Sequence, residues 1–325
     1  MRRLLLVIHG LRYLWVVLFF VAFNSAAKDD YGPLQVYSQS PFQTNSLTPQ
    51  LRSGFSNDPD TQEFYLSGTA ASIWANAGNY ELDYYQNQIS TGWKWQFEQD
   101  WQLALSYRWN YAGNNHLDGP TRWFHDLIGI DQNGREEVDD HRFIISIPDY
   151  DVNLEDFRGR TLSNAYTAYL QYQLYSSEHH AWSVGGSLYY NDINKGIFAS
   201  SRFEQALQVN YGYQRGKHQA DISAGYTSRR NQEAYQNFPL KKSVLSVSAG
   251  YRYKIAEQHT LIGEMSVYEG VSEGKDEFSK VSTEFTAGYR YTMESSALEI
   301  SATENLFNAD NSTDIAFTLG YRYRF

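Results

Sequence analysis

Apolar and polar residues alternate strictly over long stretches of this chain. The last twelve residues place one apolar set on a single face of an extended strand: Ile315, Phe317, Leu319, Tyr321, Tyr323 and Phe325. A period of two predicts a β-strand whose two faces meet different environments. The same alternation covers 244–253 and 281–291. All three segments contain Gly-Tyr-Arg-Tyr, a repeat whose interval is about one hairpin with its loop, which favours a regular up-and-down sheet.

The alternation predicts twelve strands joined by links of two lengths. The strands are expected at 62–75, 80–97, 101–111, 162–175, 181–191, 202–214, 218–228, 241–255, 259–269, 279–293, 297–306 and 313–325. Most links on one side are three to five residues long, and the longest on the other side is 112–161. No Pro falls in 61–119, 149–238 or 240–325, as expected for strands, because Pro cannot donate to a β-ladder. Short turns opposite long loops are typical of a transmembrane β-barrel whose turns face the periplasm.

The character of the two faces distinguishes a membrane barrel from a soluble sandwich. Aromatic residues mark the short-turn ends of the apolar face: Trp93, Trp95, Phe97, Trp101, Tyr211, Tyr213, Tyr251, Tyr253, Tyr289, Tyr291, Tyr321, Tyr323 and Phe325. Such a girdle belongs at a membrane interface. The opposite face is too polar for a sandwich core. We therefore predict an all-β fold, a transmembrane antiparallel up-and-down β-barrel of about 12 strands.

The expected location is the outer membrane of a Gram-negative bacterium. The expected partners there are the lipid bilayer, lipopolysaccharide and the barrel assembly machinery, which reads a terminal aromatic residue such as Phe325. The first 27 residues have three Arg, an apolar run at 14–23 and small residues at 25–27, which is the pattern of a signal peptide. The remaining chain is acidic, and this charge argues against binding of nucleic acid.

Composition excludes several other classes of protein. A mean hydropathy of −0.56 excludes a helical membrane protein. An aromatic content of 16% excludes intrinsic disorder. The chain has no Cys, which excludes disulfides, a Cys-ligated zinc site and a thiol nucleophile.

Many charged residues are predicted to face the lumen. The basic ones are Arg108, Arg252, Arg290, Arg322, Arg324 and Lys94, and the acids facing them are Asp221, Glu264, Glu284 and Glu299. One interpretation is a lumen that selects or holds an anionic solute, as charged rings do in pores. The other is a network of ion pairs that fills a narrow barrel. The sequence favours the network, and the two interpretations are compatible.

The insertion 112–161 holds a second group of candidate residues. One helical face could be formed by Leu117, Phe124, Leu127 and Ile128. We expect a short helix that covers the barrel mouth or folds into the lumen, with simple loop packing as the alternative. His125 with Asp118 or Asp126 resembles an acid–base pair, but no motif places a Ser nucleophile. The acids of the insertion match no calcium motif. We therefore assign no catalytic residue, metal site or cofactor.

The segment 28–60 precedes the first predicted strand and lacks its alternation. It contains Gly32-Pro33-Leu34 and Ser40-Pro41-Phe42 and is otherwise mostly polar. The sequence allows two placements, a periplasmic arm or a plug in the lumen. The expected organisation is thus a signal peptide at 1–27, this arm or plug, and a barrel at 61–325.

These motifs resemble an uncharacterised family of proteobacterial outer-membrane proteins, catalogued as domain of unknown function 3187. The resemblance rests on Gly32-Pro33-Leu34, Ser40-Pro41-Phe42, Leu82-Asp83, and the run from Leu117-Asp118 through Phe124-His125-Asp126 to Gly134-Arg135. The second half of the chain is similar only as barrel strands. The resemblance implies a barrel in the outer membrane and no established activity. Asp118, His125 and Arg135 match the motif, and their role is unknown.

The expected function is a channel or a binding site for a small solute. A barrel of twelve strands encloses a wider lumen than a barrel of eight strands, whose interior is filled by side chains alone. A structural or adhesive surface barrel is the alternative. A membrane-embedded hydrolase is disfavoured, and we expect no enzyme, because His180 and Ser183 are three positions apart and therefore face opposite sides of a strand.

Overall fold

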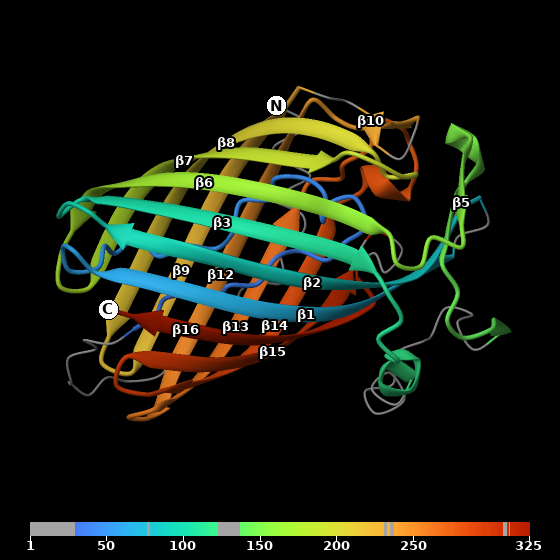
Figure 1. The fold of residues 1–325 in the computed structure, drawn as a ribbon. Helices are drawn as coiled ribbons and strands as arrows, with labels where there is room; N and C mark the ends of the chain where they lie inside the picture. Colours follow the sequence, from blue (N-terminus) through green and yellow to red (C-terminus); the bar gives the residue numbers. More distant parts are fainter. Residues whose placement is uncertain are drawn as a thin grey trace.

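The computed structural model describes residues 30–76, 79–122, 137–230, 233–234, 237–307, 311 and 313–325. One antiparallel sheet closes on itself through the pairing of its first and last strands. The strands of the barrel wall are β1 (Gln62–Asn76), β2 (Glu81–Gln96), β3 (Trp101–Ala112), β6 (Thr161–Ser176), β7 (His180–Ile193), β8 (Ser200–Arg215), β9 (His218–Arg229), β12 (Ser243–Ala256), β13 (His259–Tyr268), β14 (Ser282–Thr292), β15 (Ser296–Phe307) and β16 (Ile315–Arg324). Neighbours in sequence are neighbours in space (Figure 1). The predicted twelve-strand up-and-down barrel is confirmed.

The insertion between β3 and β6 adds structure that the sequence did not predict. Strands β4 (Ile144–Ile147) and β5 (Val152–Glu155) form a hairpin around the 3-10 helix η3 (Pro148–Tyr150). β4 pairs with the first residues of β2, so the hairpin extends the wall beyond the barrel rim (Figure 1). Residues 118–122 are helical, as expected for the start of a short helix at Asp118. Phe124, His125, Leu127, Ile128 and Arg135 lie outside the described residues.

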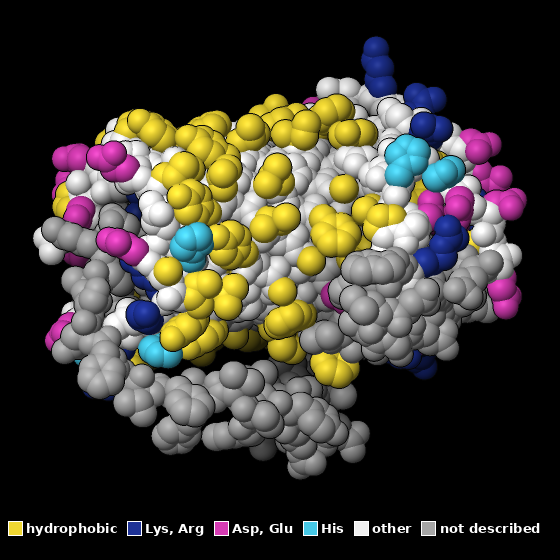
Figure 2. Space-filling model, turned by 90° about the horizontal axis from the view of Figure 1, so that it is seen from below, with side chains coloured by type: hydrophobic (Ala, Val, Ile, Leu, Met, Phe, Trp, Pro, Cys, Tyr) yellow, Lys and Arg dark blue, Asp and Glu magenta, His cyan; other side chains and the backbone are white. Residues whose placement is uncertain are grey.

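Side chains alternate between an apolar outer face and a polar inner face. Leu207, Leu319 and Leu188 point outward and are 71%, 64% and 54% exposed. Ser90, Ser183 and Asn210 point inward and are fully buried. Hydrophobic side chains spread over the wall, and charged ones gather toward its two ends (Figure 2). Such an inverted distribution suits a wall surrounded by lipid.

The predicted aromatic girdle lies at the short-turn end of the wall. Tyr251, Tyr321 and Tyr323 are about two-fifths exposed on its outer face. Histidines not predicted for this girdle recur at the starts of strands, each beside a pair of Tyr residues. Nδ1 of His180 lies 2.7 Å from the Tyr211 hydroxyl, and His218 and His259 contact Tyr251 and Tyr289 in the same way.

Terminal Phe325 completes the seam between β1 and β16. Its backbone N–H and carbonyl both form hydrogen bonds with the backbone of Gln62, while its side chain is 62% exposed on the outer face.

No helix among the described residues is both long and apolar enough to cross a membrane.

An apolar cluster closes the long-loop end of the barrel. It gathers the β4–β5 hairpin, strand β11 (Phe238–Pro239) and the 3-10 helix η4 (Glu277–Ser279). Opposite β11 lies the two-residue strand β10 (Glu233–Ala234). The buried aromatic members are Phe42, Tyr80, Tyr84, Tyr85, Phe143, Phe157, Phe198, Phe238 and Phe278. Loops from several strand pairs thus share one core, which favours a fixed arrangement over mobile loops.

Candidate functional site

Residues 30–60, called here the lumen segment, run inside the barrel and form a long hairpin. The first leg rises from Asp30, near the short-turn end, to a turn at 40–46. The second leg returns to β1, and both legs appear as the blue trace behind the front strands (Figure 1). Its backbone has no β-ladder of its own, so its polar groups bond to the wall.

Four arginines of the wall hold the foot of the lumen segment. This Arg clamp consists of Arg252, Arg290, Arg322 and Arg324. Arg252 Nη2 lies 2.7 Å from Asp30 Oδ2, and Arg290 Nη1 lies 3.3 Å from Asp30 Oδ1. The clamp also donates to consecutive backbone carbonyls, including Gly32 at 2.7 Å and Pro33 at 2.9 Å. Guanidinium groups suit this task because they present several donors in a fixed plane.

Carboxylates of the wall balance the clamp. Arg322 pairs with Glu63 at 2.6 Å and with Glu299 at 3.2 Å. Arg290 lies 2.7 Å from Glu299, and Arg252 contacts Asp221. Lys94 and Arg324 complete the group around Glu63, at 3.4 and 3.1 Å. Ion pairs therefore join Arg252, Arg290, Arg322, Arg324 and Lys94 to wall carboxylates, and the lumen segment is one of their partners.

The charge of Asp30 depends on this clamp. Burial alone raises the pKa of the Asp30 carboxyl, but Arg252, Arg290 and Arg324 outweigh burial and hold that pKa below its ordinary value. Ionised Asp30 is thus favoured by the folded state, and its ion pairs stabilise the foot at neutral pH.

We expect the stabilisation from Asp30 to disappear in acid. Because the folded pKa lies below the ordinary value of 3.8, the contribution is complete above that pH and is lost as the pH falls through the folded pKa. Asp30→Asn should reduce the free energy of unfolding by about 2 kcal/mol at pH 7. Denaturant titrations of both proteins from pH 8 downward should show a constant difference that shrinks only below about pH 4. A difference that persists unchanged at pH 2 contradicts the ion pairs.

Three buried carboxylates of the wall accept hydrogen bonds from higher parts of the lumen segment. Glu264 accepts from the Leu34 N–H at 2.7 Å, and Glu204 accepts from the Leu47 N–H at 2.7 Å. Glu284 accepts from the Ser38 and Ser40 hydroxyls, both at 2.8 Å. Carboxylates are strong acceptors for backbone donors that would otherwise be buried without partners.

Glycines of the wall leave space for the side chains of the lumen segment. A Cβ atom added to Gly225, Gly250 or Gly288 would lie within 2.7 Å of Pro49, Leu51 or Leu34, respectively. Gly250 and Gly288 begin two copies of Gly-Tyr-Arg-Tyr. In these copies the Gly accommodates an apolar side chain of the segment, the Arg holds its foot, and the Tyr residues face outward.

The tip of the lumen segment enters the apolar cluster. Phe42 stacks on Phe238 with ring centroids 4.0 Å apart and meets Phe278 edge-on at 4.9 Å. The Ser40 hydroxyl lies 3.3 Å from that of Ser282, at the upper end of β14. One continuous segment therefore contacts both ends of the barrel.

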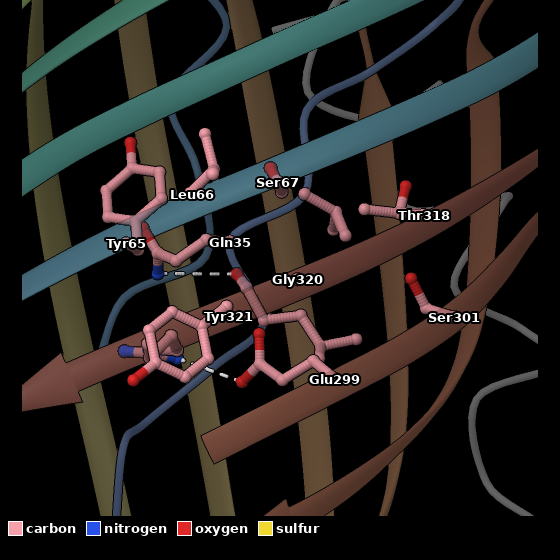
Figure 3. A pocket seen from close by; sticks show the side chains of 12 residues that line it. Gln35, Tyr65, Leu66, Ser67, Glu299, Ser301, Thr318, Gly320 and Tyr321 are labelled. Atoms are coloured by element: carbon pink, nitrogen blue, oxygen red, sulfur yellow. Dashed lines mark hydrogen bonds and ion pairs between the residues drawn. The ribbon is translucent and has the colours of Figure 1, made fainter. Parts of the chain in front are cut away.

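Two spaces beside the middle of the lumen segment are very small. A space of about 10 Å³ lies between the first leg and strands β1, β15 and β16 (Figure 3), and its lining includes Gln35, Ser67, Glu299 and Ser301. Another, of about 20 Å³, lies between the two legs near Glu264. Each holds roughly one water molecule. A cavity of about 420 Å³ lies toward the short-turn end, beside Arg52, Lys94 and Arg252.

The other predicted site residues are distributed as follows. Arg108 lies apart from the Arg clamp, where it contacts Tyr37 and the Ser46 carbonyl of the lumen segment. Asp118 is buried and accepts a hydrogen bond from the Tyr85 hydroxyl. Its Oδ2 lies 3.2 Å from His141 Nδ1. His125 and Arg135 lie outside the described residues. Among the described residues, no three His, Asp or Glu side chains are placed to hold a metal ion.

Sequence reasoning missed Asp30 and Glu63 as members of the site. Glu63 is an inward residue of the first predicted strand, so its position in the alternation could have identified it. Asp30 belongs to an irregular segment without periodicity, and no sequence signal links it to arginines more than 200 residues away.

Comparison with known proteins gives a family and a fold. The model of a family described as proteins of unknown function, DUF3187, matches residues 11–325, which extends well beyond the motifs in the first half. The COG4313 outer membrane channel from Pseudomonas putida F1 is 12% identical, with a TM-score of 0.53 over 83% of this chain and 97% of that chain. This likeness shows the fold of an outer-membrane barrel.

Two further solved barrels are similar at a lower level. The translocator domain of autotransporter NalP from Neisseria meningitidis is 10% identical, with a TM-score of 0.45 over 83% of this chain and 90% of that chain. The KdgM porin in complex with disordered oligogalacturonate is 7% identical, with a TM-score of 0.44 over 81% and 99%. No curated protein sequence matches the chain.

Proposed function

The chain belongs to the DUF3187 family, and we propose that it is an outer-membrane channel for small solutes that its own lumen segment holds closed. The observation that carries the proposal is the course of residues 30–60 through a polar lumen, with contacts at both ends. In this proposal residues 1–27 are a removed signal peptide, residues 28–60 are the plug, and residues 61–325 are the channel wall.

The chemistry of the contacts supports a plug that can leave. Hydrogen bonds and ion pairs attach most of the segment to a wall that is itself polar, so water can replace these partners when the segment withdraws. An apolar core would oppose such an exchange, because exposing it to water is costly. Apolar contacts add to these polar contacts at the tip, where Phe42 enters the apolar cluster, and at single positions along the legs such as Leu34, Leu47 and Leu51.

Withdrawal of the segment changes the charge of the lumen. It removes the Asp30 carboxylate from the Arg clamp, whereas Arg252, Arg290, Arg322, Arg324 and Lys94 remain on the wall. The carboxylates that remain beside them are Glu63, Asp221 and Glu299. Cations then outnumber carboxylates at this level, so the open channel should prefer anionic solutes.

An enzymatic role has no support in the geometry of the candidate hydrolase pair. His180 lies on the outer face beside Tyr211, whereas Ser183 is buried in the lumen and bonded to Asn210. The two side chains are on opposite sides of the wall, and a Ser nucleophile needs its base within hydrogen-bond reach.

A removable disulfide tests the channel proposal. Ser40 and Ser282 have hydroxyl oxygens 3.3 Å apart, and the chain has no native Cys. In Ser40→Cys/Ser282→Cys we expect the oxidised protein to show no conductance in a planar bilayer. Reduction should restore the brief openings of the native protein, and each single variant should behave like the native protein under both conditions. Equal activity of the oxidised and reduced double variant, with the disulfide verified, contradicts a plug that must move.

A further inference from the structure

A second basic cluster lies in the upper lumen, apart from the Arg clamp. Arg108, Arg202 and Arg229 are 2%, 4% and 2% exposed. They come from β3, β8 and β9, and the ladder places Arg108 and Arg202 in one row that runs across β3, β6, β7 and β8. Arg108 on β3 pairs with Ala165 on β6, and Ala165 pairs with Asn191 on β7. Asn191 in turn pairs with Arg202 on β8. Arg229 is opposite Glu204 on the next inward row.

The charge of Arg108 is not balanced in the way that the charges of the Arg clamp are. Glu204 lies 3.6 Å from Arg229 Nε and uses its other oxygen for the Leu47 N–H. Within the part of the chain that the structure describes, no carboxylate lies within 4 Å of Arg108. A guanidinium that is buried without a counter-charge is costly, so this position favours an anion.

Several buried donors of the same region have no hydrogen-bond partner among the described residues. They are Arg108 Nε and Nη1, Arg229 Nη2, Asn191 Nδ2 and Gln88 Nε2. The remaining Arg108 nitrogen donates to the Ser46 carbonyl at 3.3 Å. Its guanidinium lies 4.5 Å from the Tyr37 ring and 5.7 Å from the Tyr189 ring. Arg108 thus stands between the lumen segment and the wall, with donors still available.

We propose that this group of buried donors binds a small inorganic anion, with Arg108 and Arg229 as its cationic ligands and the Asn191 amide as a neutral donor. Guanidinium groups offer paired N–H donors that fit a halide or an oxyanion. The anion would neutralise Arg108 and connect the β3–β9 side of the wall to the turn of the lumen segment at Ser46. The proposal does not depend on conduction, because it concerns the closed arrangement.

Thermal unfolding with exchanged anions tests the site. We expect the melting temperature of the refolded protein to rise saturably, by roughly 2–4 °C, as sodium bromide replaces sodium gluconate at constant ionic strength. Arg108→Gln should abolish this rise, and Arg215→Gln, which removes an exposed cation at the short-turn end, should retain it. Equal melting temperatures in bromide and gluconate for the native protein would overturn the proposal. They would indicate that water, and not an anion, accepts from these donors.

A second measurement needs no variant and so does not depend on whether Arg108→Gln folds. Crystals of the native protein grown in bromide should show an anomalous peak within hydrogen-bonding distance of the Arg108 guanidinium. Repeating the thermal series with sodium phosphate distinguishes an oxyanion from a halide. Bromide peaks confined to the Arg clamp or the protein surface would contradict the site.

Discussion

Deletion of residues 30–56 should convert the closed barrel into a steadily conducting, anion-preferring pore. Two spaces beside the middle of the lumen segment are about 10 and 20 Å³, and neither can hold a hydrated ion. Removing the segment empties the middle of a twelve-strand lumen and takes Phe42 out of the apolar cluster. Single-channel recording of the refolded variant in a planar bilayer should show long openings, where we expect the intact protein to show a closed baseline with brief openings. Reversal potentials in a salt gradient should show the anion preference.

The matched control removes a different segment. Deletion of 115–135 takes away the start of the helix at 118–122 and leaves the lumen segment anchored, so that variant should stay closed. Both variants must retain the circular dichroism of a β-barrel for the comparison to count. Conductance after loss of 115–135 alone would assign the closure to the insertion. Absence of conductance in both folded variants would contradict the channel and favour a structural barrel.

The barrel could be predicted because its physical cause is local. Each strand needs one face for lipid and one for a polar lumen, and this requirement gives a period of two in the residues themselves. The β4–β5 hairpin escaped prediction for the opposite reason. Its strands have only four residues each, too few for the alternation to be distinctive, and Ile145, Ile147, Val152 and Leu154 are buried in an apolar cluster formed by remote parts of the chain.

The contacts of the lumen segment could not be predicted because its partners are remote. Alternation placed Glu264 and Glu284 on the inner face, but it could not show that they accept from Leu34, Ser38 and Ser40 rather than pair with arginines. Register fixes the direction of a side chain and gives no information on what enters the barrel. The Gly-Tyr-Arg-Tyr repeat was visible in the sequence, whereas the fit of Gly288 to Leu34 needed the fold.

Among single substitutions in the Arg clamp, we expect Arg322→Met to lower the free energy of unfolding strongly. The Arg322 side chain is 1% exposed and contacts Glu63, Glu299 and the carbonyls of Tyr31 and Pro33. Removing the cation from a buried ion pair leaves the carboxylates without their main counter-charge. We expect the free energy of unfolding to fall by about 3 kcal/mol. Lys94, Arg290 and Arg324 remain beside these carboxylates and limit the loss. Denaturant unfolding in lipid vesicles, followed by Trp fluorescence, measures the loss. Arg215→Met, at an exposed position, should change the stability little.

The same substitution in the protein that lacks 30–56 separates the two tasks of Arg322. In that background the carbonyls of Tyr31 and Pro33 are already absent, so only the contacts with Glu63 and Glu299 remain to be lost. If Arg322 holds the foot of the segment, the free energy lost on Arg322→Met should be smaller there, because interacting sites are not additive. The difference between the two losses is the coupling between Arg322 and the segment. Equal losses in both backgrounds would mean that Arg322 stabilises only the wall and that the foot is held by Arg252, Arg290 and Arg324.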